Sequence, residues 1–271
     1  MFLEIDICSP MFLEIDIVFP CLCIAGRNED GVIVNGNRLF NTDEKGFSQR
    51  ANSVSRGVVA RHQSSRACAA TSSPTWQHIT VASFISLSGR RYPTGVVVST
   101  SSLQNDFKKL WPQAFFYPNK GGSVTSAIIA DMVVNCMAKP AREFIPTGKP
   151  LILCLDSGGG SWLYLSAAFL KACLTFGIKP FYYPAWTTKA LCPLDQCCHS
   201  TMARLWSQWK QLWAYKQQPL TLFTALKACG QIVDETLQPD SVRASWSQCG
   251  FRLNEPFNHD KIFIQRKREI F

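Results

Sequence analysis

A run of five apolar residues, Leu151-Ile-Leu-Cys-Leu155, leads directly into Asp156 and then into three glycines, Gly158 to Gly160. Continuous apolar runs of this length are typical of strands that are buried on both faces, and such strands occur in sheets covered by helices. Because an unpaired carboxylate is costly to bury, we expect Asp156 at the carboxyl end of the strand, where open α/β sheets bind their ligands. A turn or helix-capping role is the alternative for this aspartate.

Periodic patterns of apolar residues predict the other elements of an α/β chain. Residues 78–87 and 94–99 are β-branched and apolar and flank a glycine-containing turn, which predicts an antiparallel hairpin. After the 151–155 strand, a helix is expected at 161–176 and a strand at 178–183, a succession that implies a right-handed parallel crossover. The helix should be buried, because it is apolar almost all round. Further strands are predicted at 37–43 and 53–61, a loop at 112–122, and helices at 101–111, 123–138 (ended by Pro140), 195–216, 219–233 and 239–250.

The composition indicates a packed core. Of the 271 residues, 46% are hydrophobic and eight are tryptophans, which argues against disorder. No apolar stretch is long enough to cross a bilayer, and Glu4 and Asp6 interrupt the segment where a secretory signal would lie, so no membrane partner is expected. The twelve cysteines are expected to be reduced and mostly buried.

The first twenty residues contain a repeat, in which residues 1–7 recur as residues 11–17. We expect residues 1–24 to be a duplicated, peripheral leader. Residues 25–260 are predicted to form one domain, and residues 261–271 a basic tail.

Charge is distributed unevenly along the chain, whose net charge is +9. Residues 1–40 contain two arginines and six acidic residues, whereas the other 231 residues contain 26 basic and 13 acidic ones. A basic body of this kind indicates a polyanionic partner such as nucleic acid. A soluble cationic protein without such a partner is the alternative.

Three aspartates, Asp43, Asp156 and Asp195, each end or follow an extended segment and begin a loop or helix. If they meet, two carboxylates about 4 Å apart repel by roughly 1 kcal/mol in water and about 4 kcal/mol at an effective dielectric of 20, so a proton or a cation must compensate. Mg²⁺ suits a site with few carboxylates and room for substrate phosphates, and two such ions stabilise the entering and leaving oxygens of a phosphoryl transfer. The pattern therefore favours cleavage or transfer on a nucleic-acid backbone.

Three other kinds of site are less well matched. A zinc site built from the cysteines and histidine at positions 192, 197, 198 and 199 lacks a C-x-x-C pair. A serine hydrolase using Ser161 lacks the second glycine of G-x-S-x-G, where Leu163 stands. A phosphate-binding loop at Gly158 to Gly160 lacks the spacing of either glycine-rich nucleotide motif.

Five short motifs follow one another along residues 25–260. They are N-T-D-E-K-G-F at 41–47, H-I-T-V at 78–81, L-D-S-G-G-G-S at 155–161, P-A-W-T-T at 184–188 with P-L-D-Q at 193–196, and the segment 242–256 with G-F at 250–251. In this order they resemble the DDE superfamily endonuclease domain of pogo, Tigger and jerky-type transposases, relatives of centromere protein B. The resemblance implies an α/β, RNase H-like mixed sheet flanked by helices on both faces. It also implies that Asp43, Asp156 and Asp195 are catalytic and hold two Mg²⁺ (or Mn²⁺) ions, with Glu44 as a neighbour and not a ligand.

The chain departs from the family pattern around the acids. Ser161 and Trp162 stand where the family usually has a histidine, and residues 1–36 are too short for a helix-turn-helix domain, so we expect an N-terminally truncated copy. The implied partner is DNA, with a homo-oligomer on DNA left open, and the implied location is the nucleus. Two functions remain: a transposase-derived endonuclease domain performing metal-dependent phosphodiester cleavage and strand transfer, or a catalytically inactive, domesticated nucleic-acid-binding module.

Overall fold

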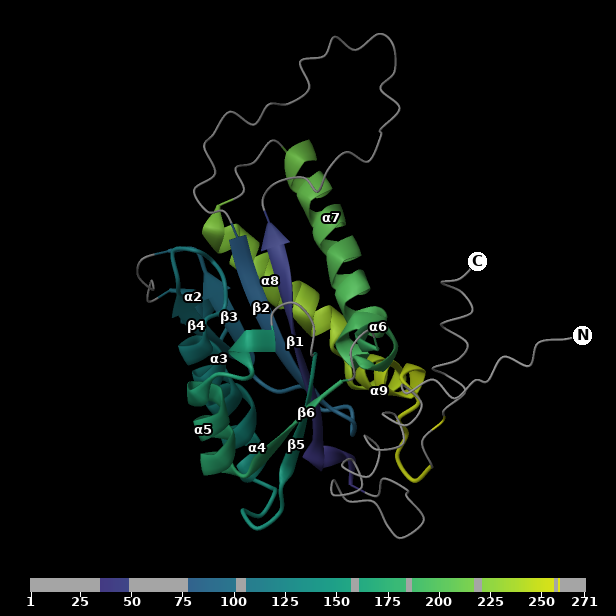
Figure 1. Ribbon diagram of the computed structural model, residues 1–271. Helices are drawn as coiled ribbons and strands as arrows, with labels where there is room; N and C mark the ends of the chain where they lie inside the picture. Colours follow the sequence, from purple (N-terminus) through teal and green to yellow (C-terminus); the bar gives the residue numbers. More distant parts are fainter. Residues whose placement is uncertain are drawn as a thin grey trace, which may run out of the picture.

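Six strands form one mixed sheet in the computed structural model, in the order β4-β3-β2-β1-β5-β6 (Figure 1). The structure describes residues 35–48, 78–100, 106–156, 161–183, 187–216, 221–255 and 258. The pairs β1–β2 and β2–β3 are antiparallel, whereas β1–β5, β5–β6 and β3–β4 are parallel. The strands are β1 (Leu39–Ser48), β2 (His78–Ser86), β3 (Thr94–Val98), β4 (Ala114–Pro118), β5 (Leu151–Leu155) and β6 (Ile178–Tyr182).

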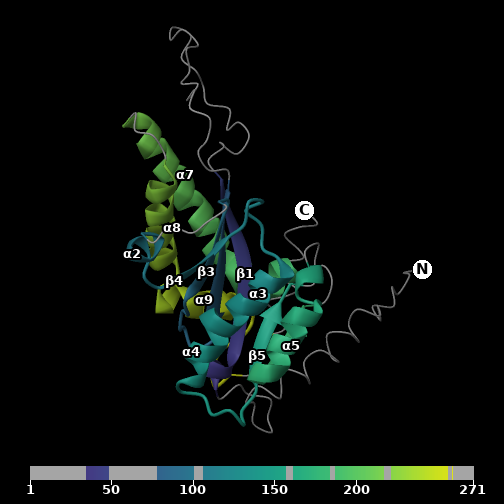
Figure 2. The same cartoon turned by 90° about the vertical axis from the view of Figure 1, so that its left-hand side faces the viewer.

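Helices cover both faces of the sheet, and Figure 2 shows the two helical layers with the sheet between them. One buried cluster joins the sheet to α2 (Phe107–Leu110), α7 (His199–Tyr215), α8 (Leu222–Thr236) and α9 (Pro239–Gln248). The second joins the opposite face to α3 (Ser126–Met132), the π-helical η3 (Val133–Ala138), α4 (Lys139–Arg142) and α5 (Ala167–Phe176). The predicted α/β mixed sheet flanked by helices on both faces is confirmed. The short elements are η2 (Gly36–Arg38), η4 (Ser161–Leu163), α6 (Thr188–Leu191) and the π-helical η5 (Leu194–Cys198).

The alternation of side chains along β1 assigns its residues to the two layers. Leu39 and Phe47 belong to the cluster on the α7 side, whereas Phe40 belongs to the cluster on the α5 side. Because successive residues of a strand point to opposite faces, Asp43 shares the α7 side with Leu39 and Phe47. Glu44 therefore points toward the α5 side.

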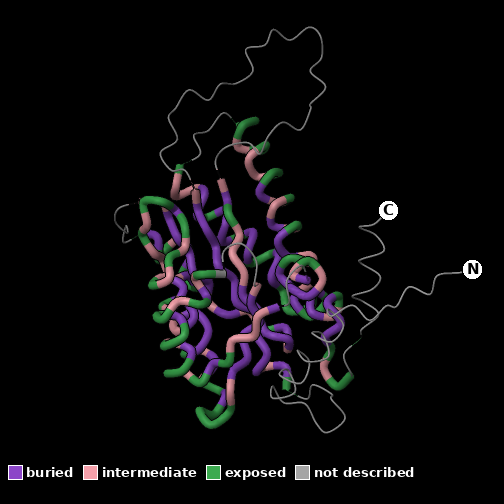
Figure 3. Tube along the Cα trace, viewed as in Figure 1, coloured by how far each residue is buried: buried purple, intermediate pink, exposed green. Residues whose placement is uncertain are grey.

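Three predicted features of the sheet are confirmed. Every residue of β5 is buried, as the apolar run at 151–155 indicated. β2 and β3 form the predicted antiparallel hairpin. β5, α5 and β6 form the predicted parallel crossover, and Gly177, with φ of 62°, ends α5 in the left-handed conformation. Figure 3 shows the buried strands enclosed by helices whose outer faces are exposed.

Two strand predictions were wrong. The strand predicted at 37–43 does not end at Asp43 but continues to Ser48, because β2 pairs with β1 from Phe40 to Ser48. The loop predicted at 112–122 contains β4, which pairs in parallel with β3 at the edge of the sheet. β4 is a short apolar run, Ala114-Phe-Phe-Tyr117, and the prolines at 112 and 118 beside it are typical of a loop or an edge strand.

Two helix predictions need correction. The helix at 161–176 begins only at Ala167, capped by Ser166, and it is not buried all round, since Leu174 is 83% exposed. No described helix or strand covers the outer face of α5, so apolar residues on that face are exposed. The helix expected to end before Pro140 continues to Arg142, because the π-helical segment η3 changes the hydrogen-bond pattern immediately before the proline.

The leader at 1–24, the strand predicted at 53–61 and the tail at 261–271 lie outside the described residues. The division of the chain into these parts stays a prediction. Within the described portion, no helix combines the length and apolar character needed to cross a membrane.

Candidate metal centre

Asp43 lies in the middle of β1, which pairs antiparallel with β2 and parallel with β5. Its backbone is fixed by pairing with Ser83 of β2 on one side, and its Oδ1 accepts a hydrogen bond from the Glu44 amide at 2.8 Å. The side chain is 20% exposed. Burial raises the pKa of the Asp43 carboxyl well above its usual value, and the negative charge of Asp195 raises it further.

Asp195 and His199 approach Asp43 from the start of the long helical segment. Asp195 lies in η5 and His199 begins α7, and the spacing of four places the two side chains on one face of the segment. His199 Nδ1 lies 3.2 Å from Asp195 Oδ1 and 3.4 Å from Asp43 Oδ2. The hydrogen bond with His199 lowers the pKa of Asp195, although its partial burial acts in the opposite direction.

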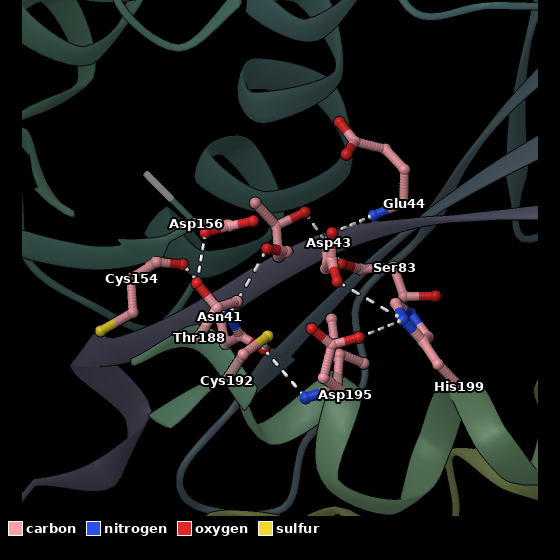
Figure 4. Close-up of polar contacts among 12 residues, drawn as sticks. Asn41, Asp43, Glu44, Ser83, Cys154, Asp156, Thr188, Cys192, Asp195 and His199 are labelled. Atoms are coloured by element: carbon pink, nitrogen blue, oxygen red, sulfur yellow. Dashed lines mark hydrogen bonds and ion pairs between the residues drawn. The ribbon is translucent and has the colours of Figure 1, made fainter. Parts of the chain in front are cut away.

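Together, the three side chains each offer one ligand atom within 4.8 Å of the other two. Within the part of the chain that the structure describes, this is the one group of three such residues close enough to share an ion. The imidazole is almost completely buried, whereas Asp195 remains 36% exposed. The centre therefore has a buried side at His199 and a more exposed side at Asp195. Figure 4 shows the three side chains directed toward one another.

Asp156 lies beside this cluster but is not one of the three. In the parallel pairing of β1 with β5, Asn41 is opposite Cys154, so Asp156 and Asp43 each lie two residues further along. The Asp156 carboxylate accepts a hydrogen bond from the Thr188 hydroxyl of α6, and its charge contributes to the raised pKa of Asp43. In Figure 4 it lies on the side of Asp43 away from His199. The structure thus brings two of the predicted aspartates together with a histidine and places the third next to them.

Glu44 points away from the cluster, as the alternation along β1 requires. Its Oε1 accepts a hydrogen bond from the Tyr164 hydroxyl at 2.7 Å on the α5 side of the sheet. Burial raises the pKa of Glu44, and the Tyr164 hydrogen bond opposes that shift. Tyr164 therefore satisfies this carboxylate, which lies outside the group of potential ligands.

Asn41 connects the strand that bears Asp43 to the segment that bears Asp195. It is fully buried, and its Nδ2 donates to the Cys154 carbonyl at 3.2 Å. Its Oδ1 accepts from the Leu194 amide, also at 3.2 Å. One amide side chain thus joins β1, β5 and the start of η5. The residue was not singled out from the sequence, although it lies two positions before Asp43 and so points to the same face.

His199 was also missed as a partner of the aspartates. In the sequence it drew attention only with Cys192, Cys197 and Cys198, and among the described residues these thiols do not join it in a metal-binding group. The available signal was the Asp195-x-x-x-His199 spacing inside a predicted helix, which places both side chains on one face. The His199 Nε2 is buried and has no hydrogen-bond partner within the described structure.

The donor set fits a divalent cation. Two carboxylates and one imidazole lie within reach of one point, and a cation there would favour the charged form of Asp43, whose pKa is raised first by burial and then by the charge of Asp195. Carboxylate oxygens suit Mg²⁺ and Mn²⁺, whereas an imidazole nitrogen favours Mn²⁺ and the later transition metals.

Comparison with known proteins gives structural neighbours only. No family model matches the sequence, and no curated protein matches it. The catalytic domain of Mos1 mariner transposase superposes with a TM-score of 0.43 at 10% identity, and the match covers 93% of this chain and 100% of the Mos1 chain.

The Mos1 mariner paired end complex with Mn gives a TM-score of 0.45 at 12% identity, and the match covers 95% of this chain and 67% of the Mos1 chain. The chain thus spans about two thirds of the transposase in that complex. Values of this size do not assign the chain to a family.

Proposed function

We propose that the chain is a DDE-type, transposase-derived endonuclease domain of the pogo, Tigger and jerky type, which cleaves phosphodiester bonds in DNA with divalent cations. The convergence of Asp43, Asp195 and His199 carries the proposal. Asp43 lies in the first strand and Asp195 in η5, after all six strands, yet their oxygens reach one histidine nitrogen at 3.4 and 3.2 Å. The order of the sequence motifs supports the choice of family, and the basic body supports DNA as the substrate.

In this proposal each residue has a defined task. Asp43, held in a central strand, and Asp195 hold the cation, and His199 supplies a nitrogen from the buried side once Nδ1 is free of its proton. Asp156, oriented by Thr188, would hold a second ion beside the first. Mg²⁺ or Mn²⁺ bound here would lower the pKa of an attacking water or 3′-hydroxyl and stabilise the charge of the phosphate.

Asn41 acts on this site through position alone. By binding both the Cys154 carbonyl and the Leu194 amide, it fixes how far Asp195 lies from Asp43. Catalysis with two ions requires them to be about 3.5–4 Å apart, so an error of one ångström in this distance matters. A nuclear location and assembly as a homo-oligomer on DNA belong to the same proposal.

A catalytically inactive DNA-binding module is the second candidate. The hydrogen bond from Thr188 to Asp156 favours it, since it keeps the third carboxylate out of the cluster. In that case His199 would serve to neutralise Asp43 and Asp195 without any metal.

Nicking of supercoiled plasmid in Mg²⁺ or Mn²⁺ separates the two candidates. The enzyme requires cleavage by the wild type that is lost in chelator and in Asp43→Asn, Asp156→Asn and Asp195→Asn. Asp106→Asn is the matched control, because this aspartate is 59% exposed and forms only a surface ion pair with Lys109. Absence of cleavage by a folded, DNA-binding wild type would instead support the inactive module.

A further inference from the structure

A cavity of about 720 Å³ lies beside the amino end of β1. Its walls come from the turn between β2 and β3, the junction between α8 and α9, and Asn37 before β1. Between Asn37 and Asp43 the chain makes two steps in the 3-10 turn η2 and four in β1, which gives a separation of roughly 17 Å at about 2.0 and 3.3 Å per residue. The lining includes three arginines and no carboxylate: Arg90, Arg91 and Arg243.

Arg90 is the arginine with the most free hydrogen-bond donors. Its guanidinium carbon lies 4.2 Å from the centre of the Phe144 ring. Stacking on an aromatic face supports the guanidinium plane but leaves its edge free to donate. Within the described part of the chain, no carboxylate lies within ion-pair distance of Arg90.

Arg91 and Arg243 are held in place by partners on the rim. Arg91 contacts Asp234 at 2.5 Å and Gln113 at 2.7 Å, and Arg243 contacts Asp240 at 2.5 Å and donates to the Ser88 carbonyl. These carboxylates are 55% and 95% exposed, respectively, and exposed pairs contribute little energy. They orient the two guanidinium groups, and each group keeps further N–H donors, since a guanidinium has five.

The amino end of α9 adds further donors. The ten-residue helix begins at Pro239, and the side chain of Gln238 at its N-cap forms no capping hydrogen bond. The first amides of a helix lack partners within the helix, and the helix dipole favours an anion there. Gln238 and Pro239 both line the cavity, and because proline has no N–H, the first amides of the helix are those of Asp240 and Ser241, which directly follow these lining residues.

Gly89 allows the hairpin turn to close against this helix. Its φ is +91°, and a Cβ at this position would lie 2.6 Å from Arg243 Nη1 and 2.8 Å from the Pro239 carbonyl oxygen. The glycine therefore brings Arg90 and Arg243 to the same cavity.

We propose that this cavity is a second DNA-binding site, which takes a backbone phosphate roughly 17 Å from the acidic centre. A backbone phosphodiester carries one negative charge, and guanidinium groups and helix amides bind such an anion together. A separation of roughly 17 Å corresponds to about five nucleotides at 3.4 Å per phosphate along one strand. The choice of DNA as the source of the phosphate rests on the proposed function, but the site itself needs neither the metal centre nor cleavage.

The test measures affinity for a duplex in chelator, so that a failure of catalysis does not affect it. Binding is measured from low to moderate salt for the wild type, for Arg90→Gln and for Arg90→Gln/Arg243→Gln. Lys149→Gln/Lys171→Gln is the matched control, because it removes two exposed charges elsewhere. Circular dichroism verifies that each variant is folded, and the single variant leaves the Arg243 contacts intact.

We expect the double variant to lose about tenfold in affinity for the duplex at low salt. The steepness with which log K falls with log salt should decrease by about 0.9, the value for one lost phosphate contact. Arg90→Gln should show part of this loss and the control little change in slope. An unchanged slope in the folded arginine variants would overturn the proposal. It would also be overturned if these variants lost affinity for inorganic phosphate alone while duplex binding stayed at the wild-type level.

Discussion

His199 Nδ1 lies 3.4 Å from Asp43 Oδ2, although the two residues are far apart in the chain. The same nitrogen lies 3.2 Å from Asp195 Oδ1, so one imidazole contacts both carboxylates. If a divalent cation bound between the two carboxylates, the same nitrogen would be placed to act as its third ligand.

His199 should determine which metal binds best. Replacing its imidazole with the amide of His199→Asn removes a nitrogen donor that favours Mn²⁺ over Mg²⁺. We expect at least a tenfold loss of Mn²⁺ affinity and a smaller loss for Mg²⁺, measured by isothermal titration calorimetry. Equal losses for the two ions would mean that the histidine acts on the site only indirectly.

Asn41 should matter for stability as well as for the site. Asn41→Ala leaves the Leu194 amide and the Cys154 carbonyl without their buried partner, which should cost about 3 kcal/mol in the free energy of unfolding. Urea denaturation measures this loss, and metal affinity should fall with it. Asn135→Ala, which removes an exposed hydrogen bond to Lys139, is the control and should change stability by less than about 0.5 kcal/mol. If Asn41→Ala were equally mild, the proposed connection between the strands and η5 would be wrong.

Thr188 should orient Asp156 during catalysis. Thr188→Val removes the hydroxyl that donates to this carboxylate while keeping the shape of the side chain. By analogy with outer partners of metal ligands, we expect nicking to fall about 10–100-fold. Activity at the wild-type level would show that Asp156 needs no such support, and increased activity would show that Thr188 restrains it.

The pH dependence of stability should differ between the two clustered aspartates. The pKa of Asp43 is raised in the folded state by burial and then by Asp195, so this residue stabilises the fold only at low pH, and the benefit is lost as pH rises through the raised pKa. In chelator, Asp43→Asn should therefore be more stable than the wild type at neutral pH.

The pKa of Asp195 is lowered by the His199 hydrogen bond, so Asp195→Asn should be less stable than the wild type at neutral pH. This difference in stability should disappear as pH falls through the lowered pKa. Thermal unfolding from pH 3 to 8 measures both, and stabilisation by Asp195→Asn would contradict this assignment.

Metal affinity should also depend on pH. Because the pKa of Asp43 is raised, first by burial and then by Asp195, and its carboxyl must be ionised to coordinate a cation, Mn²⁺ affinity should increase with pH and binding should release protons. Calorimetry in buffers of different ionisation enthalpy measures the number released. A pH-independent affinity across pH 5–8 would contradict coordination by Asp43.

The central strand was predictable because its signal is local. The run at Leu151–Leu155 is buried on both faces, so each of its residues is apolar, and Asp156 follows where the strand ends. β1 was predicted too short because Asp43 and Glu44 interrupt its apolar pattern. Their carboxylates are accommodated by partners from distant segments, His199 and Tyr164, which the local sequence does not reveal.

The candidate site was predictable in part for the same reason. Each aspartate follows a recognisable local pattern, but whether the aspartates meet depends on strand register and on the path between β6 and η5. The pairing of Asn41 with Cys154 places Asp156 beside Asp43, and the Asn41 bond to the Leu194 amide brings Asp195 to them. His199 lies four residues after Asp195, so both side chains are on one face of the helical segment. This spacing identifies His199 as part of the site only when Asp43 is known to face the same segment.

Electron paramagnetic resonance of bound Mn²⁺ tests the Asp43–Asp195–His199 centre most directly, because hyperfine coupling reports the donor atoms. The account predicts a directly coordinated ¹⁴N for the Mn²⁺ that Asp43 and Asp195 hold in the wild type, the loss of that coupling in His199→Asn, and much weaker binding in Asp195→Asn. Bound Mn²⁺ without nitrogen coupling, or binding that survives Asp195→Asn unchanged, would contradict it.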